Sequence, residues 1–343
     1  MTWKLKRRRW VPGGWIEARK KEILMKTRLI CSSHSPLLYC FKKEPKRWDE
    51  MQKTFEERAE AIRVFAPELV IAFGSDHFNG FFMDNMPPFC VGFQAEAEED
   101  IGGFAGPLAV DAEIAQRLVV DLRENNIDPA ISLSMTVDHA FSQTIHIMLG
   151  RLDAYPVIPI FINCITKPFV PFVRSRLLGE AVGRFVTGLG KRILFLSSGG
   201  MSHHPTRYYP LLGEGEERVT AWQMSGGKDP ASLTRREWLD RLDVMHREGA
   251  EMIARGERTA AQMRLNEEAD RQFLDVLTSG NLEEFDSWDQ EKLVADAGIG
   301  SMELHTWIAA SAAHMSCGGT PPEVSFYSVT PELGIATGVV YGK

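Results

Sequence analysis

Short, wholly apolar runs recur along this sequence, and segments with helical periodicity separate them. Residues 69–73, 157–162 and 193–196 are runs of the kind that form strands buried on both faces of a sheet. Residues 173–188, between the second run and the third, have the periodicity of an amphipathic helix. A strand, a helix and a strand in this order form a β-α-β unit, which predicts an α/β fold built in layers.

The remaining periodic segments extend this pattern over most of the chain. The predicted elements are helices at 47–65, 112–124 and 233–258, three to four helical segments up to residue 315, and strands at 27–30, 324–329 and 335–341. Between residues 26 and 343 there is no repeat, low-complexity segment or Pro/Ser-rich linker. We therefore expect one large domain.

The composition excludes several classes of protein. The net charge of −7 argues against a nucleic-acid partner, because such proteins usually present a basic face. The five cysteines are odd in number, widely spaced and form no Cys-x-x-Cys pair, which favours a cytoplasmic location over a disulfide framework or a Cys-rich zinc site. No apolar run approaches the roughly 20 residues that span a bilayer, so no membrane contact is expected.

The first 24 residues differ from the rest of the chain. Residues 1–24 are rich in lysine and arginine and lack the apolar segment of a secretory signal. We interpret them as a disordered basic extension, or as the product of a start upstream of an ancestral first residue, Met25. The folded domain is then predicted to occupy residues 25–343.

Four of the nine histidines, His34, His77, His139 and His203, come just after strand-like runs, in loops rich in Gly, Ser and Asp. In open α/β sheets, functional groups collect beyond the carboxyl ends of the strands. Taken singly, each is equally well a loop histidine, and His139 could simply form an ion pair with the adjacent Asp138. Together they predict a functional cluster. The histidines at helical positions, interpreted as structural, are His146, His246, His305 and His314.

A cluster of neutral imidazoles with a carboxylate is typical of a metal site. Two histidines and one carboxylate on one face of an octahedral ion leave positions open, which suits non-haem Fe(II). Three histidines around tetrahedral zinc are the alternative. Further histidines beside the metal could act as acid and base, because their pKa lies near neutral pH. The sequence contains no G-x-S-x-G hydrolase motif and no P-loop.

Several segments together resemble one known family. They are CSSHSP (31–36), SDHFNGFFMDNMPPFCVG (75–92), MTVDHAFSQ (135–143), VIPIFIN (157–163), RSRLLGEAVGRF (174–185) and RILFLSSGGMSHHP (192–205). This set is similar to the type III, LigB-like, extradiol ring-cleavage dioxygenases, and above all to the branch that cleaves 3-(2,3-dihydroxyphenyl)propionate. The resemblance runs from about Met25 to the C-terminus. It implies a three-layer α/β/α domain with a mixed central sheet.

The resemblance also implies the metal and its ligands. Fe(II) would be held by His34, His77 and Glu303, the last in a G-x-x-E-[LI]-x-x-W pattern at residues 300–307. Without the resemblance, Glu303 is a first-turn glutamate favoured by the helix dipole.

The acid and base of the reaction are implied in the same way. His139 and His203 match the second-sphere pair of the family. Three neighbouring residues, Ala140, Thr144 and His204, depart from the pattern of the branch. Because they lie beside the catalytic groups, these departures affect the expected preference for a substituent on the substrate ring more than the expected reaction.

The implied reaction is Fe(II)-dependent meta cleavage of a catechol by O2 to a 2-hydroxymuconate-semialdehyde-type product, within aromatic catabolism. The expected substrate is 3-(2,3-dihydroxyphenyl)propionate or a similar 3-substituted catechol, and the expected assembly is a homo-oligomer. The alternatives are protocatechuate, gallate or an aminophenol as substrate, a zinc-dependent hydrolase, and a non-catalytic metal-binding module.

Two sets of residues are candidates for contact with the substrate. An apolar wall, or plain core, is expected from Phe78, Phe81, Phe82, Pro87, Pro88 and Phe89. A substrate carboxylate needs a cation, and a bidentate arginine fits it best. The candidates are Arg174, Arg176 and Arg207.

Overall fold

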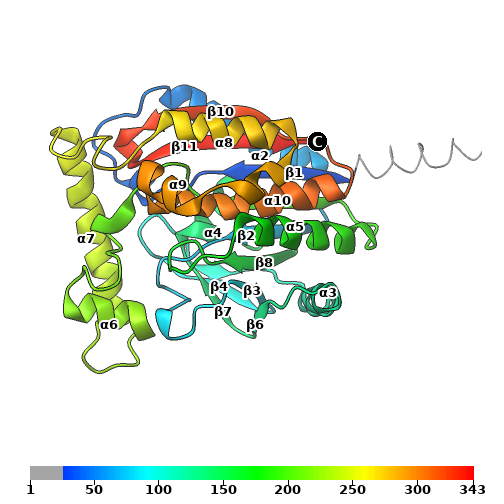
Figure 1. Ribbon diagram of the computed structural model, residues 1–343, viewed down its shortest axis with the longest axis horizontal. Coiled ribbons are helices and arrows are strands. Elements are labelled where there is room, and N and C mark those ends of the chain that lie inside the picture. Colours follow the sequence, from blue (N-terminus) through cyan, green and yellow to red (C-terminus); the bar gives the residue numbers. More distant parts are fainter. Residues whose placement is uncertain (1–25) are drawn as a thin grey trace, which may run out of the picture.

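Eight strands form the central sheet of the computed structural model, which describes residues 26–343 (Figure 1). Their order is β10 (Glu323–Thr330), β11 (Ile335–Gly342), β1 (Thr27–Ser32), β9 (Ile193–Ser198), β2 (Leu69–Gly74), β8 (Val157–Ile162), β3 (Phe89–Gly92) and β6 (Ala130–Ser132). The strands β1, β9, β2 and β8 are parallel neighbours, and β11 and β3 pair with the two outer ones in antiparallel fashion. The predicted mixed sheet is confirmed. The extension predicted at residues 1–24 lies outside the described residues.

Helices cover both faces of this sheet, as the wholly buried strands β2, β8 and β9 require. One face packs against α2 (Trp48–Phe65) and α4 (His139–Leu149). The other packs against α3 (Ala112–Glu124), α5 (Phe172–Thr187), α8 (Glu267–Ser279), α9 (Gln290–Ala297) and α10 (Leu304–Ser316). The three-layer α/β/α prediction is confirmed.

The predicted β-α-β unit is present: β8 and β9 are joined through α5, and β2 lies between them in the sheet. A second sheet, which no periodicity indicated, consists of β5 (Gly106–Pro107), β4 (Ala95–Ala97) and β7 (Met135–Val137). Strands of two or three residues are too short to show an alternating pattern.

Two further helices, α6 (Glu217–Ser225) and α7 (Arg235–Ala254), stand across the end of the sheet at which the parallel strands finish (Figure 1). They are fastened to the loop after β2: Trp222 donates to the carbonyl of Phe78 (2.9 Å), and Trp238 donates to Oδ1 of Asn79 (3.1 Å). This lobe therefore closes over the loop that carries His77.

The remaining elements are short turns of 3-10 helix: η1 (Pro36–Tyr39), η2 (Met83–Asn85), η3 (Pro205–Arg207), η4 (Leu282–Ser287), η5 (Ile299–Glu303) and η6 (Pro331–Leu333). Among the described residues, no helix combines the length and the apolar character that crossing a membrane would require.

Helices α5 and α10 approach closely because glycine lies at their contact. A Cβ atom at Gly179 would lie 2.0 Å from the carbonyl oxygen of Ala309. We expect Gly179→Ala to lower the free energy of unfolding by about 1–3 kcal/mol, because the overlap with backbone outweighs the gain in helix propensity of about 1 kcal/mol. Urea unfolding would measure it. Gly188→Ala, at the end of the same helix with φ −71°, should change little.

Candidate active site

The four histidines predicted to cluster do meet, and all are buried. His34, His77 and His203 follow β1, β2 and β9, whose carboxyl ends share one edge of the sheet. The ring centroids of His34 and His77 are 5.5 Å apart. The fourth, His139, does not follow the strand-like run at 131–134 directly, because β7 intervenes and His139 opens α4. Its ring lies 5.3 Å from that of His34.

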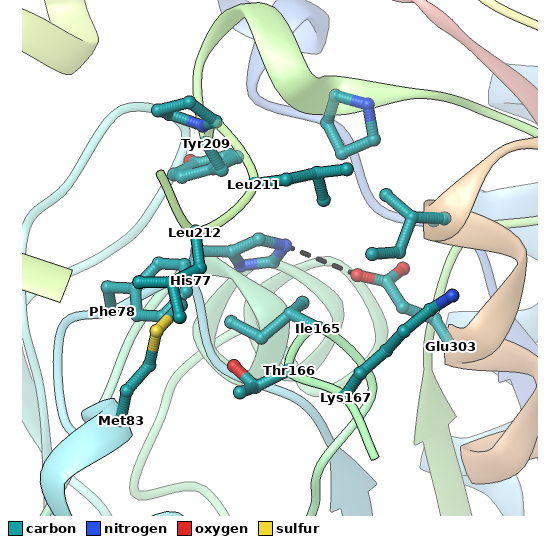
Figure 2. Close-up of a pocket in the computed structure, with 14 residues that line it drawn as sticks. His77, Phe78, Met83, Ile165, Thr166, Lys167, Tyr209, Leu211, Leu212 and Glu303 are labelled. Carbon is teal, nitrogen blue, oxygen red and sulfur yellow. Dashed lines mark hydrogen bonds and ion pairs between the residues drawn. The ribbon is translucent and has the colours of Figure 1, made fainter. Parts of the chain in front are cut away.

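Three hydrogen-bond acceptors converge at this edge. Oε1 of Glu303 lies 3.2 Å from Nε2 of His77 (Figure 2). The same oxygen lies 3.6 Å from Nε2 of His34. The outer nitrogens are already engaged: Nδ1 of His77 donates to Oδ2 of Asp138 (3.2 Å), and Nδ1 of His34 is 2.9 Å from Oγ of Ser198. With Nδ1 of each ring as the donor, both Nε2 atoms are acceptors that face the carboxylate, and a metal ion or an added proton between them would satisfy all three atoms.

The electrostatics agree with a place for positive charge. Burial lowers the pKa of His34 to about 3, so this imidazole is neutral and able to bind a metal. Burial also acts to lower the pKa of His77, but the carboxylates of Asp138 and Glu303 outweigh it and raise that pKa well above its usual value. The pKa of Glu303 is held below its usual range: burial raises it, and His34 and His77 more than offset this.

The orientation of the rings distinguishes a two-histidine site from a three-histidine site. His34, His77 and His139 offer ligand atoms within 4.8 Å of one another. The rings of His77 and His139, however, are stacked at 4.3 Å and 17°, so their in-plane lone pairs run side by side. The rings of His34 and His77 are nearly perpendicular at 83°. Two stacked rings direct their lone pairs along parallel lines, which argues against one ion bound by all three histidines.

His139 and His203 are each held through Nδ1, which leaves Nε2 free. Nδ1 of His203 donates to the carbonyl of Met201 (2.9 Å). Nδ1 of His139 bonds to Oδ2 of Asp100, whose Oδ1 accepts the backbone N–H of His139 (3.0 Å). Burial lowers the pKa of His139 to about 3 and also lowers that of His203. Both rings are therefore neutral at pH 7.

The acidic partner of His139 is not the one that the sequence suggested. The adjacent Asp138 caps α4 through the N–H of Ala140 (2.9 Å) and binds His77 with its other oxygen. The partner is Asp100, in a loop 39 residues away. Nothing in the sequence around Asp100 indicates this role, because the contact depends on how the small sheet folds.

Glycines allow the chain to pack closely against both Glu303 and His203. Glu303 ends η5 and is only 1% exposed, so it is not an ordinary glutamate on the first turn of a surface helix. Its Oε2 accepts the backbone N–H of Gly200. A Cβ atom at Gly300 would lie 2.1 Å from Cε1 of His203, and one at Gly199 would lie 2.7 Å from the carbonyl of Glu303. These glycines leave the space in which both side chains lie.

Comparisons with known proteins show the family of the chain. Residues 28–337 match the family described as the catalytic LigB subunit of aromatic ring-opening dioxygenase. The chain belongs to the LigB family. It is therefore an extradiol ring-opening dioxygenase.

Two curated LigB relatives cover nearly the whole chain. One from Rhodococcus sp, named 2,3-dihydroxyphenylpropionate/2,3-dihydroxicinnamic acid 1,2-dioxygenase, is 40% identical over 92% of this chain and 99% of its own. A relative of the same name from Escherichia coli O139:H28 is 40% identical over 90% of this chain and 96% of its own. A crystal structure of an uncharacterized Escherichia coli K12 protein covers 92% of this chain and 98% of its own, at 12% identity and a TM-score of 0.45.

A cavity of about 310 Å³ opens beside the acceptors of this LigB protein (Figure 2). Its wall is mainly apolar and includes His77, Phe78, Met83, Ile165, Thr166, Lys167, Tyr209, Leu211, Leu212, Ile299 and Glu303. The hydroxyl of Tyr209 is buried and has no hydrogen-bond partner among the described residues. A buried polar group without a partner normally costs stability, so this hydroxyl is available to a ligand.

The predicted apolar wall is only partly correct. Phe78 lines the large cavity, but Phe81 stacks on Phe161 at 3.7 Å, Phe82 packs edge-on against Trp222, and Phe89 belongs to β3 in the core. Pro87 and Pro88 line neither of the two cavities beside the histidines. A run of apolar residues does not by itself tell a wall from a core.

A second, smaller cavity also has His77 and Tyr209 in its wall. Its wall includes His34, His77, His139, His203, Tyr208, Tyr209, His246 and Arg258. His246 is buried and donates to the carbonyl of Leu242 (2.7 Å), as the structural interpretation expects, but its position on this wall was not anticipated. Of the three departures from the branch pattern, Thr144 bonds to Ser198 (2.8 Å), which in turn contacts His34.

The predicted arginines are not placed to meet a substrate. Arg176 is paired with Asp286 and Glu180, and Arg207 with Glu248. Neither these two nor Arg174 lines either cavity beside the histidines. The sequence showed which residues are cationic, but not which of them already have an acidic partner.

Asp270 supports the loop that carries His203. Its carboxylate accepts hydrogen bonds from the N–H (2.8 Å) and hydroxyl (2.6 Å) of Ser202 and from the hydroxyl of Tyr327 (3.0 Å). Burial, which outweighs these bonds, raises the pKa of Asp270 to about 6.

This shift predicts a pH effect on stability. The folded chain keeps the proton of Asp270 to higher pH than the unfolded chain, whose aspartates titrate near pH 3.9, so this contribution to stability is lost as pH rises from about 4 to about 6. Asp270→Asn should therefore gain up to about 3 kcal/mol relative to wild type between pH 4 and pH 7. Urea unfolding at both pH values would measure it, and a pH-independent difference would contradict it.

Proposed function

We propose that this LigB enzyme is an Fe(II)-dependent dioxygenase that cleaves 3-(2,3-dihydroxyphenyl)propionate, or a similar 3-substituted catechol, with O2. His34, His77 and Glu303 are the proposed metal ligands. The observation that carries this assignment is the convergence of their three acceptor atoms, with both outer imidazole nitrogens engaged elsewhere. The names of the curated relatives support the substrate.

Fe(II) at this position would supply a Lewis acid with open coordination positions for the two substrates. Two histidines and one carboxylate are the ligand set that suits this metal. The partners of the outer nitrogens fix the direction of each ring, which is how outer contacts tune a metal site.

His139 and His203 are the proposed acid and base. Each is neutral and keeps Nε2 as a free acceptor, so either can take a proton from a catechol hydroxyl and return it as the ring opens. Both line the smaller cavity next to His34 and His77.

The large cavity is the proposed site for the aromatic ring. Its volume of about 310 Å³ and its apolar wall suit one substituted catechol. The unpartnered hydroxyl of Tyr209 can bond to a ring oxygen. Burial of Glu303 and His77 at its inner end keeps bulk water from the reacting groups.

The test is anaerobic reconstitution with Fe(II), followed by 3-(2,3-dihydroxyphenyl)propionate in air-saturated buffer. We expect equal consumption of substrate and O2, together with the yellow absorbance of the ring-fission product. Protocatechuate, gallate and an aminophenol in the same assay are the alternatives, and a higher kcat/KM for one of them would replace the proposed substrate. Reconstitution with Zn(II) should give no O2 uptake.

The homo-oligomer and the cytoplasmic location expected from the sequence stay predictions. Light scattering of the purified protein would measure its mass in solution.

A further inference from the structure

Among the described residues, two cations lie on the walls of the cavities beside the histidines, and their surroundings differ. Lys167 lines the large cavity, but its ammonium points away from His77 and binds Glu291 at 2.5 Å (Figure 2). Arg258 lines the smaller cavity and has no ion pair with any carboxylate in the described part of the chain. Among residues 26–343, the one hydrogen bond of its side chain goes from Nη1 to the hydroxyl of Tyr208 (2.6 Å).

The aromatic ring of Tyr208 and its neighbours hold the guanidinium of Arg258 in place. The ring of Tyr208 stacks on His246 at 3.7 Å, and the guanidinium carbon of Arg258 lies 4.9 Å from the centre of the same ring. A Cβ atom at Gly249 would lie 2.2 Å from the Tyr208 hydroxyl. Glycine is unfavourable inside a helix such as α7. Its presence at position 249 is explained by the close approach of the Tyr208 hydroxyl, which any larger residue would block.

In the part of the chain that the structure describes, the wall of this cavity offers Arg258 no acidic partner. No described aspartate or glutamate lines it, and Arg258 is the one described lysine or arginine in its wall. A guanidinium offers five N–H donors in a planar fork, and most of those of Arg258 are not used by the protein. Such a fork matches a carboxylate in a bidentate manner.

We propose that Arg258, together with the Tyr208 hydroxyl, binds the carboxylate on the side chain of the substrate. The inference rests on the proposed function. In a 3-substituted catechol the side chain stands next to a hydroxyl that binds the metal, so its carboxylate must lie close to the metal ligands. The cavity of Arg258 includes His34 and His77, two of those ligands, in its wall.

The test compares kcat/KM for 3-(2,3-dihydroxyphenyl)propionate with kcat/KM for 3-propylcatechol, which has the same chain length and no charge. We expect Arg258→Met to lower the ratio of the two values by about ten-fold or more, because a charge-assisted bidentate contact is lost. Arg258→Lys should give an intermediate ratio. Arg255→Met is the matched control, because Arg255 is exposed, is paired with Glu257 and lines neither cavity.

An unchanged ratio in Arg258→Met, or a fall in Lys167→Met instead, would overturn the inference. Binding of 3-phenylpropionate, measured by calorimetry without turnover, separates it from the proposed function. Wild-type protein that binds this acid about ten-fold more tightly than Arg258→Met, yet cleaves no catechol, would refute the proposed substrate and keep the anion site. Equal binding by both proteins, or none by wild type, would remove the anion site.

Discussion

Replacing Glu303 by glutamine is expected to lower ring-cleavage activity by about a thousand-fold or more, and to lower iron affinity as well. The change keeps the shape of the side chain but removes the negative charge opposite His34 and His77. The metal contributes several kcal/mol to such reactions, so loss of a ligand removes an effect of this size. Weakening even an outer partner of a metal ligand typically costs 10–100-fold in metal affinity.

The measurement is iron content after anaerobic loading, together with O2 uptake. Glu180→Gln is the control: this carboxylate is half-buried on α5, pairs with Arg176 and lines neither cavity, so its loss should leave both readouts near wild type. Full iron content and full activity in Glu303→Gln would contradict the assignment. The three-histidine set with His139 would then be the better description of the site.

Replacing His203 or His139 by glutamine is expected to lower kcat by about 10²–10⁴-fold while iron stays bound, because each change removes an acid or base but no metal ligand. The ring of His139 stacks on that of His77, whereas the rings of the proposed ligands His34 and His77 are nearly perpendicular. Iron content near one per chain, with KM changed less than kcat, would separate this role from a structural one.

A buried histidine outside the site provides the control for these variants. His314 is fully buried at the end of α10, and neither of its ring nitrogens has a side-chain partner among the described residues. His314→Gln should therefore change stability more than kcat. Loss of iron in His139→Gln together with full retention in His34→Gln would reverse the proposed roles of the two residues.

Much of the fold was predictable because its main strands are buried on both faces. Such strands must be wholly apolar, and β2, β8 and β9 are therefore visible as runs in the sequence. Helix α3 was predictable from a different pattern, its helical periodicity, and its bounds of Ala112–Glu124 agree with the prediction. The strand order could not be predicted, because periodicity shows that a strand is buried but not which strand lies beside it.

The sequence by itself also indicated His34, His77 and His203, because the end of a strand is visible in a sequence and parallel strands end at one edge. Which groups act on them was decided by tertiary structure alone. Asp100 reaches His139 through the fold of a small sheet, and Glu303 reaches His77 across 226 residues of chain. Local pattern carries no information on such contacts, because they depend on how separate elements pack. For the same reason only the folded chain shows that Arg176 is already paired, whereas Arg258 faces the histidines without a carboxylate among the described residues.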